Sequence, residues 1–138
     1  MTLSNERGSA LIITLMLMLI LTAIGIYAIS ISTTEMSIAL QSKTGTATLN
    51  SAESGSNYAI DQIPVLKTGY TDNLADKSSY SVTSSYTGTM TFKPGYGSIF
   101  GFPHIEVASQ GRAPDPFVAT RTVQVVVIYG PVPVGTMY

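Results

Sequence analysis

The sequence predicts an α+β fold, in which a long N-terminal helix packs on a small antiparallel sheet of three to four strands. The first reason is an apolar stretch, residues 10–31, which reads ALIITLMLMLILTAIGIYAISI and lies in a charge-free segment. The second is a proline-free stretch, residues 32–62, which follows without a helix breaker. The third is the rest of the chain, where runs rich in Val, Thr, Tyr and Ile alternate with turn residues, as strands do.

The apolar stretch is long enough to cross a membrane. Roughly 20 apolar residues at about 1.5 Å each cover a hydrocarbon core of about 30 Å. Polar residues do not return at every third or fourth position, as they do in the surface helix of a soluble domain. The segment therefore belongs in lipid or in a bundle of equally apolar helices.

A polar head, MTLSNERG, precedes the apolar stretch. A secretory signal peptide has an apolar core of about 7 to 15 residues and then a small-residue cleavage site. The core here is longer and no A-x-A site closes it, so we expect a retained membrane anchor. Because Arg7 is the only basic residue before Lys43, the positive-inside bias predicts a cytoplasmic N-terminus.

The second half of the helix carries one narrow apolar stripe at steps of three and four residues. Pro64 then stops the helix, because proline cannot continue the hydrogen-bond ladder. We therefore expect a helical region at residues 9–63, with its first half in the membrane, and a β-rich domain at residues 64–138. The stripe comprises Leu49, Ala52, Ser56, Ala59 or Ile60, and Ile63.

One side of the apolar half is small or polar, and we interpret it as a helix-packing face. Small side chains let a second helix approach closely, and hydroxyls can bond across to it or back to a preceding carbonyl. The alternative is that these scattered residues have no role. Gly25 is also a point where the helix could bend or melt. The face comprises Thr14, Met18, Thr22, Gly25 and Ser32.

The β-rich part divides into strands and loops by its turn residues. Residues 117–129 give the strongest strand signal, with Val123, Val125 and Val127 on one face. The other predicted elements are a loop at 64–77, a hairpin at 80–92 that turns at Thr87-Gly88, a loop at 93–102, a short strand at 104–109, a turn at 110–116 and an extended tail at 130–138.

Composition excludes several classes of function. The formal charge of −1 and the 11% of charged residues provide no basic patch for a phosphate backbone, so we expect no nucleic-acid partner. Cysteine is absent, which excludes disulfides and thiolate metal sites. Histidine and clustered carboxylates are too few for a catalytic constellation. We therefore predict no enzyme activity and no cofactor.

Two polar groups could hold a metal ion, although an ordinary role is favoured for both. His104 and Glu106 lie two residues apart, on one face of a predicted strand. Asp72, Asn73 and Asp76 could supply oxygen ligands to calcium, but they do not fit the EF-hand spacing. A structural histidine and a polar loop are the simpler interpretations, and no metal site is predicted.

Glu53 and the tyrosines each allow two interpretations. Glu53, beside the apolar stripe, either bonds to the sheet or is solvated. The tyrosines form either an adhesive surface, because tyrosine is favoured at binding hot spots, or part of the core and of cross-strand packing. They are Tyr70, Tyr80, Tyr86 and Tyr96.

The N-terminal region resembles that of type IV pilins and pseudopilins, and in particular PilX-type minor pilins. The residues that carry the resemblance are Arg7-Gly8-Ser9-Ala10-Leu11, Leu21-Thr22, Gly25 and Ser51-Ala52-Glu53-Ser54-Gly55. The resemblance implies the pilin fold and a prepilin leader at residues 1–8. It also implies that prepilin peptidase cleaves between Gly8 and Ser9, and that the new N-terminus at Ser9 is methylated.

The resemblance further implies a structural role in pilus assembly or priming, at or near the fibre tip. Expected partners are the major pilin, other minor pilins, a tip adhesin, prepilin peptidase and the inner membrane. The chain would be a single-pass protein of that membrane before assembly, and part of a cell-surface pilus, or fimbrium, afterwards. The alternatives are a type II secretion pseudopilin and a single-pass membrane-anchored binding module.

One residue departs from the usual pilin pattern. Most pilins have glutamate at the fifth position after cleavage, where it neutralises the N-terminal ammonium of a neighbouring subunit. Here that position is Ile13. An unpaired buried charge is costly, so a subunit without this carboxylate should dock poorly beneath another copy of itself. The departure favours a minor, tip-proximal subunit.

Overall fold

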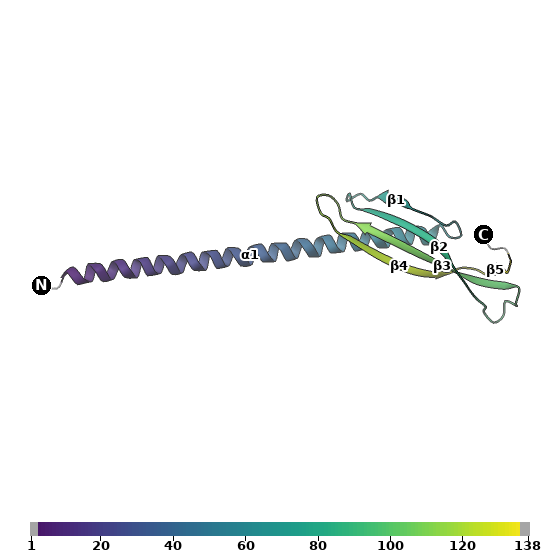
Figure 1. Ribbon diagram of the computed structural model, residues 1–138, viewed down its shortest axis with the longest axis horizontal. Coiled ribbons are helices and arrows are strands. Elements are labelled where there is room, and N and C mark those ends of the chain that lie inside the picture. The colour runs from purple at the N-terminus through teal and green to yellow at the C-terminus, as the bar shows by residue number, and fades with distance from the viewer. Residues whose placement is uncertain (1–2, 136–138) are drawn as a thin grey trace. The chain divides into compact units, whose positions relative to one another are not determined.

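The structure is a computed structural model that describes residues 3–135, with side chains described from residue 8 onward. The chain divides into two compact units, Met1–Gln41 and Ser42–Tyr138. One helix, α1 (Leu3–Asp61), is followed by five strands (Figure 1). The strands are β1 (Tyr70–Asn73), β2 (Ser79–Thr91), β3 (Phe100–Arg112), β4 (Thr120–Ile128) and β5 (Val132–Pro133).

The first unit is the apolar part of α1. Every side chain described there, at residues 8–41, is exposed. The threonine hydroxyls bond back to the helix: Thr14 donates to the Leu11 carbonyl at 2.9 Å, and Thr22 donates to the Met18 carbonyl at 3.0 Å. Their donor protons are therefore bonded locally, without a second helix.

In the second unit, the end of α1 packs on one face of an antiparallel sheet, which confirms the predicted fold class (Figure 1). The sheet has the strand order β1-β2-β3-β4, and β5 pairs with the start of β3. Ala59 of α1 meets the inner face of β2 and β3 in one buried cluster. The strand residues in that cluster are Tyr80, Val82, Ile105 and Val107.

The buried stripe of α1 is only partly the predicted one. Ala52, Ser56 and Ala59 are buried as expected, but Leu49 is 42% exposed. Thr48 and Ser51 are fully buried instead. The reason is that the helix approaches β3 where that strand carries Gly111, which leaves room for small side chains and none for leucine.

The predicted hairpin at residues 80–92 is wrong, because residues 80–91 lie in a single strand, β2. The pairing shifts between Tyr86, opposite Ile105, and Met90, opposite Pro103. Three residues of β2 thus lie opposite His104, and Gly88 within them has a φ of 75°. Thr87-Gly88 is a β-bulge, which uses the same residue types as a turn.

The remaining strands differ from expectation in length. β4 confirms the strongest predicted strand. β3 runs from Phe100 to Arg112, so it includes parts of a predicted loop and turn. β1 lies inside the predicted loop 64–77 and pairs with β2, with Tyr70 opposite Val82. A strand of four residues is too short to show a clear alternation in the sequence.

Candidate functional site

The predicted processing site lies in an accessible part of the chain. Gly8 and Ser9 are exposed and lie within α1. A Cβ placed at Gly8 would meet no atom within 4 Å, so nothing described crowds this position. The leader begins with Met1 and Thr2, outside the described residues, and the Arg7 side chain is also outside them. Cleavage and methylation stay predictions.

The predicted helix-packing face stays a prediction as well. All five of its residues, Thr14, Met18, Thr22, Gly25 and Ser32, are exposed. The backbone remains helical through Gly25, where a Cβ would have open space. The hydroxyls of Thr14 and Thr22 already donate to carbonyls of their own helix. The face would therefore contact a second helix mainly through close packing.

One helix in the described chain is long and apolar enough to span a membrane, and it lies near the N-terminus. Its apolar window has a mean hydropathy of 2.6, and none of that window is buried. The large side chains of Leu11, Met18 and Ile26, for example, are 69%, 72% and 70% exposed. The hydrophobic effect requires a cover for this surface, which lipid or other helices can supply.

The end of α1 is held against the sheet by very close backbone contact. A Cβ at Gly55 would lie under 3.0 Å from the side chains of Ser109 and Tyr80. A Cβ at Gly111 would meet the Thr48 carbonyl oxygen, the Ser51 hydroxyl and the Ala52 nitrogen at similarly short range. Small residues on both elements therefore define how this part of the helix sits on β3.

Three tyrosines pack together beside this contact. The Tyr58 and Tyr70 rings stack with their centroids 4.8 Å apart, and Tyr80 lies 6.3 Å from Tyr58. The hydrogen bond with Tyr58, together with burial and the nearby Asp72 carboxylate, raises the pKa of Tyr70 to about 12. Burial, and then the same carboxylate, raise the pKa of Tyr80. The packing interpretation therefore fits these tyrosines, and an adhesive role for them stays a prediction.

Tyr86, Tyr96 and Glu53 differ in how they contact the rest of the domain. Tyr86 also packs against the core, but Tyr96 is 48% exposed and meets Phe102 edge-on at 5.1 Å. Glu53 is exposed, and in the described part of the chain its carboxylate contacts no sheet residue through a hydrogen bond or ion pair. The solvated interpretation therefore fits Glu53.

The possible metal ligands have local structural contacts. Asp76 accepts hydrogen bonds from the Ser78 hydroxyl at 2.5 Å and from the Ser78 N–H at 3.0 Å, which lowers its pKa. The His104 Nε2 atom lies 2.6 Å from the Thr91 hydroxyl oxygen, across the β2 bulge. Among the described residues no group of three His, Cys, Asp or Glu side chains could hold a metal ion.

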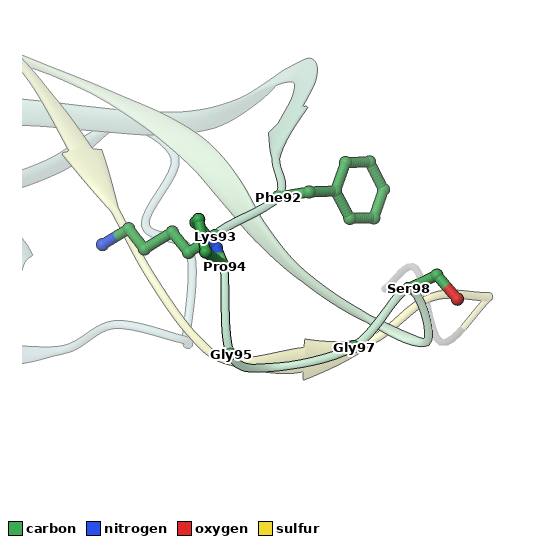
Figure 2. A pocket seen from close by; sticks show the side chains of 6 residues that line it. All are labelled: Phe92, Lys93, Pro94, Gly95, Gly97 and Ser98. Atoms are coloured by element: carbon green, nitrogen blue, oxygen red, sulfur yellow. The ribbon is translucent and has the colours of Figure 1, made fainter.

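The loop between β2 and β3 encloses a shallow hollow of about 510 Å³, lined by residues 92–95, 97 and 98. Figure 2 shows that the Phe92 ring and the Lys93 side chain point in opposite directions, away from a shared centre. The Lys93 ammonium lies 4.5 Å from the centre of the Phe102 ring. Polar groups do not converge in this hollow, so it lacks the features of a ligand site.

The long apolar helix and the antiparallel sheet on its far end form an α+β arrangement like that of pilins, and the helix is long and apolar enough to fit membrane anchoring. The family model described as PilX N-terminal matches residues 7–57. This match confirms the predicted resemblance to the PilX-type minor pilins of type IV pili, over the helical segment that carries it. No curated protein and no solved structure matches the chain.

Proposed function

We propose that the protein is a minor pilin, a structural subunit that takes part in the assembly or priming of a type IV pilus at or near its tip. The match of residues 7–57 to PilX N-terminal carries the proposal. In this proposal the chain enters the inner membrane as a single-pass protein with its N-terminus in the cytoplasm. Prepilin peptidase cleaves after Gly8, and Ser9 becomes the methylated N-terminus.

The exposed apolar helix supports a role in a fibre core. Before assembly, lipid covers residues 10–31, and after assembly the equivalent helices of the major pilin and other minor pilins do so. The transfer exchanges one apolar environment for another, so packing rather than burial from water selects the partner. Thr14, Met18, Thr22, Gly25 and Ser32 are the proposed contact face.

Ile13 supports a position at or near the tip. A subunit with isoleucine at this position cannot neutralise the N-terminal ammonium of a subunit above it in the fibre. Docking of this subunit beneath another one is therefore unfavourable. A subunit that starts the fibre has no subunit above it, so the missing carboxylate carries no penalty there.

The first experiment is to measure the intact mass and N-terminal sequence of the protein, from native membranes and from sheared surface fibres. We expect a chain that starts at methylated Ser9 and is present in trace amounts in the fibres. The variant Gly8→Val should remain uncut. The matched control Gly25→Val should be cut normally, because both glycines are exposed and have space for a side chain.

The two alternatives give different outcomes. An uncut wild-type chain that starts at Met1 and stays in the membrane would contradict the proposal and leave a membrane-anchored binding module as the better account. A type II secretion pseudopilin would also be cut. Its deletion, however, would block protein secretion and leave surface pili at wild-type numbers.

A further inference from the structure

The solvent-facing side of the sheet has a polar depression that the fibre role does not use. Its volume is about 290 Å³, and it is distinct from the loop hollow of Figure 2. We refer to it as the Arg112 depression, after its only charged lining residue. The lining residues are Thr71, Ser79, Tyr80, Ser81, Gln110, Arg112 and Thr120.

The strand register explains why these residues meet. In the first row across the sheet, Ser79 pairs with both Asn73 and Arg112, and Arg112 pairs with Thr120. The next row on the same face consists of Thr71, Ser81, Gln110 and Thr122. The four main strands lie side by side (Figure 1). Their register therefore places polar residues of all four strands at one end of one face.

This face lies opposite the core. Tyr80, between Ser79 and Ser81 in β2, is only 5% exposed, and its ring packs with those of Tyr58 and Tyr70. Since side chains alternate along a strand, Ser79 and Ser81 point to the other face. The depression therefore offers hydroxyl, amide and guanidinium groups, without an aromatic platform.

The charge of Arg112 is available. Its side chain is exposed, and within the described residues no ion pair or side-chain hydrogen bond engages its guanidinium. No Asp or Glu lines the depression. Glu106 shares this face of β3 but lies six residues away, roughly 20 Å along an extended strand. At that distance salt screens the pair almost completely.

The chemistry of these groups selects a ligand class. A guanidinium binds a carboxylate through two parallel hydrogen bonds, which a planar anion matches best. Serine and threonine hydroxyls and a glutamine amide both donate and accept, so they match sugar hydroxyls, whereas a phosphate oxygen only accepts. The volume is near the lower end of small-molecule sites, about 300 Å³, which limits the occupant to one small ring.

We propose that the Arg112 depression binds a carboxylate-bearing sugar, with the carboxylate on Arg112 and the ring hydroxyls on Ser79, Ser81, Gln110 and Thr120. The ligand is a uronic acid unit at the end of, or within, an acidic polysaccharide. Because no aromatic ring stacks on the sugar, the ion pair supplies most of the discrimination against neutral sugars.

The experiment is a titration of the isotope-labelled full chain, in micelles of a polyoxyethylene detergent, followed by amide NMR shifts. The probe is trigalacturonate, and its methyl ester is the uncharged control of similar shape. We expect saturable shifts at residues 79–81, 110–112 and 120. Affinity for the methyl ester should be at least about tenfold weaker, the loss typical of a removed charge-assisted pair.

The variant Arg112→Gln should weaken binding of trigalacturonate by at least about tenfold. Its matched control is Arg121→Gln, which removes the same charge from the same end of the sheet. Arg121 pairs with Gly111, on the opposite face, so binding should not change. Unaltered shifts of the core residues Ile105 and Val107 show that each variant is folded.

Three results would overturn the proposal. One is the absence of localised shifts in the wild-type chain at millimolar probe. Another is equal loss of binding in Arg112→Gln and Arg121→Gln, which would indicate a nonspecific charge effect. The third is inorganic phosphate binding as tightly as trigalacturonate, which would make the depression a general anion site.

Discussion

Gly111 of β3 lies directly against the Thr48 carbonyl oxygen of α1, and no side chain can be placed between them. The Ser51 hydroxyl and the Ala52 nitrogen close the remaining space. Two of the obstructing atoms belong to the helix backbone and cannot rotate away. The packing of α1 on the sheet thus depends on a missing Cβ as much as on the apolar cluster.

Gly111→Ala should therefore destabilise the domain by roughly 1–3 kcal/mol, because the helix and β3 must separate to admit the methyl group. Chemical unfolding of the full chain in micelles, followed by the near-ultraviolet signal of the tyrosines, measures this change. Gly45→Ala is the control, since a Cβ there meets nothing within 4 Å. It should stabilise the helix by about 0.5–1 kcal/mol. A neutral Gly111→Ala variant would contradict the packing described.

Ile105→Ala should cost about 2–5 kcal/mol of unfolding free energy, because Ile105 is fully buried at the centre of the apolar cluster. Ile128→Ala removes the same atoms from a side chain that is 50% exposed. It should cost about 1 kcal/mol or less. Unfolding by urea distinguishes the two, and equal costs would place the core elsewhere.

Asp76 should make the domain less stable in acid. Its pKa is lowered from 3.8 by the hydrogen bonds from Ser78, so the folded state favours the carboxylate. The resulting stabilisation is complete above the ordinary pKa and is lost as the pH falls through the lowered one. Asp76→Asn and Ser78→Ala should each flatten this part of the pH dependence, measured by urea unfolding between pH 7 and pH 2. If both variants keep the wild-type pH dependence of stability, the hydrogen bonds from Ser78 to Asp76 do not stabilise the domain.

Ile13→Glu should raise the number of copies in the fibre, if the chain is a minor pilin. The new carboxylate can neutralise the N-terminal ammonium of a neighbouring subunit, which the wild-type isoleucine cannot. Ile12→Glu is the control, because it places the same charge at a neighbouring position on the helix. The cost of that charge in the membrane, about 2.5–3.5 kcal/mol at mid-depth, is the same for both variants. Quantitative mass spectrometry of sheared fibres should show enrichment for Ile13→Glu alone. Equal incorporation of both variants would exclude a specific pairing.

The long elements could be predicted because their residue patterns are uniform. A charge-free, mostly apolar run of more than 20 residues predicts a long helix in an apolar environment, and seven β-branched residues among the nine of β4 predict a strand. The buried face of α1 was harder to predict, because it depends on the surface of the sheet against which the helix packs. Leu49 is exposed because the sheet presents Gly111, and no helical periodicity contains that information.

The middle of the sheet could not be predicted for a related reason. Thr87-Gly88 fits a hairpin turn and a β-bulge equally well, and only the pairing with His104 distinguishes them. The Arg112 depression was missed because it exists only once four strands are in register. The available signal was the alternation of Gln110 and Arg112 in a single strand, which indicates one polar face.

The edge position of β4 has a consequence for association between copies of the protein. It is the last strand of the main sheet, and its outward residues Val126 and Ile128 are 57% and 50% exposed. A long, β-branched edge strand is a template on which another chain can add. In a copy that has not yet assembled, this edge is open to pairing with the same edge of another copy. If the chain is a pilin, early capture by its assembly partners would remove that exposure as well as build the fibre.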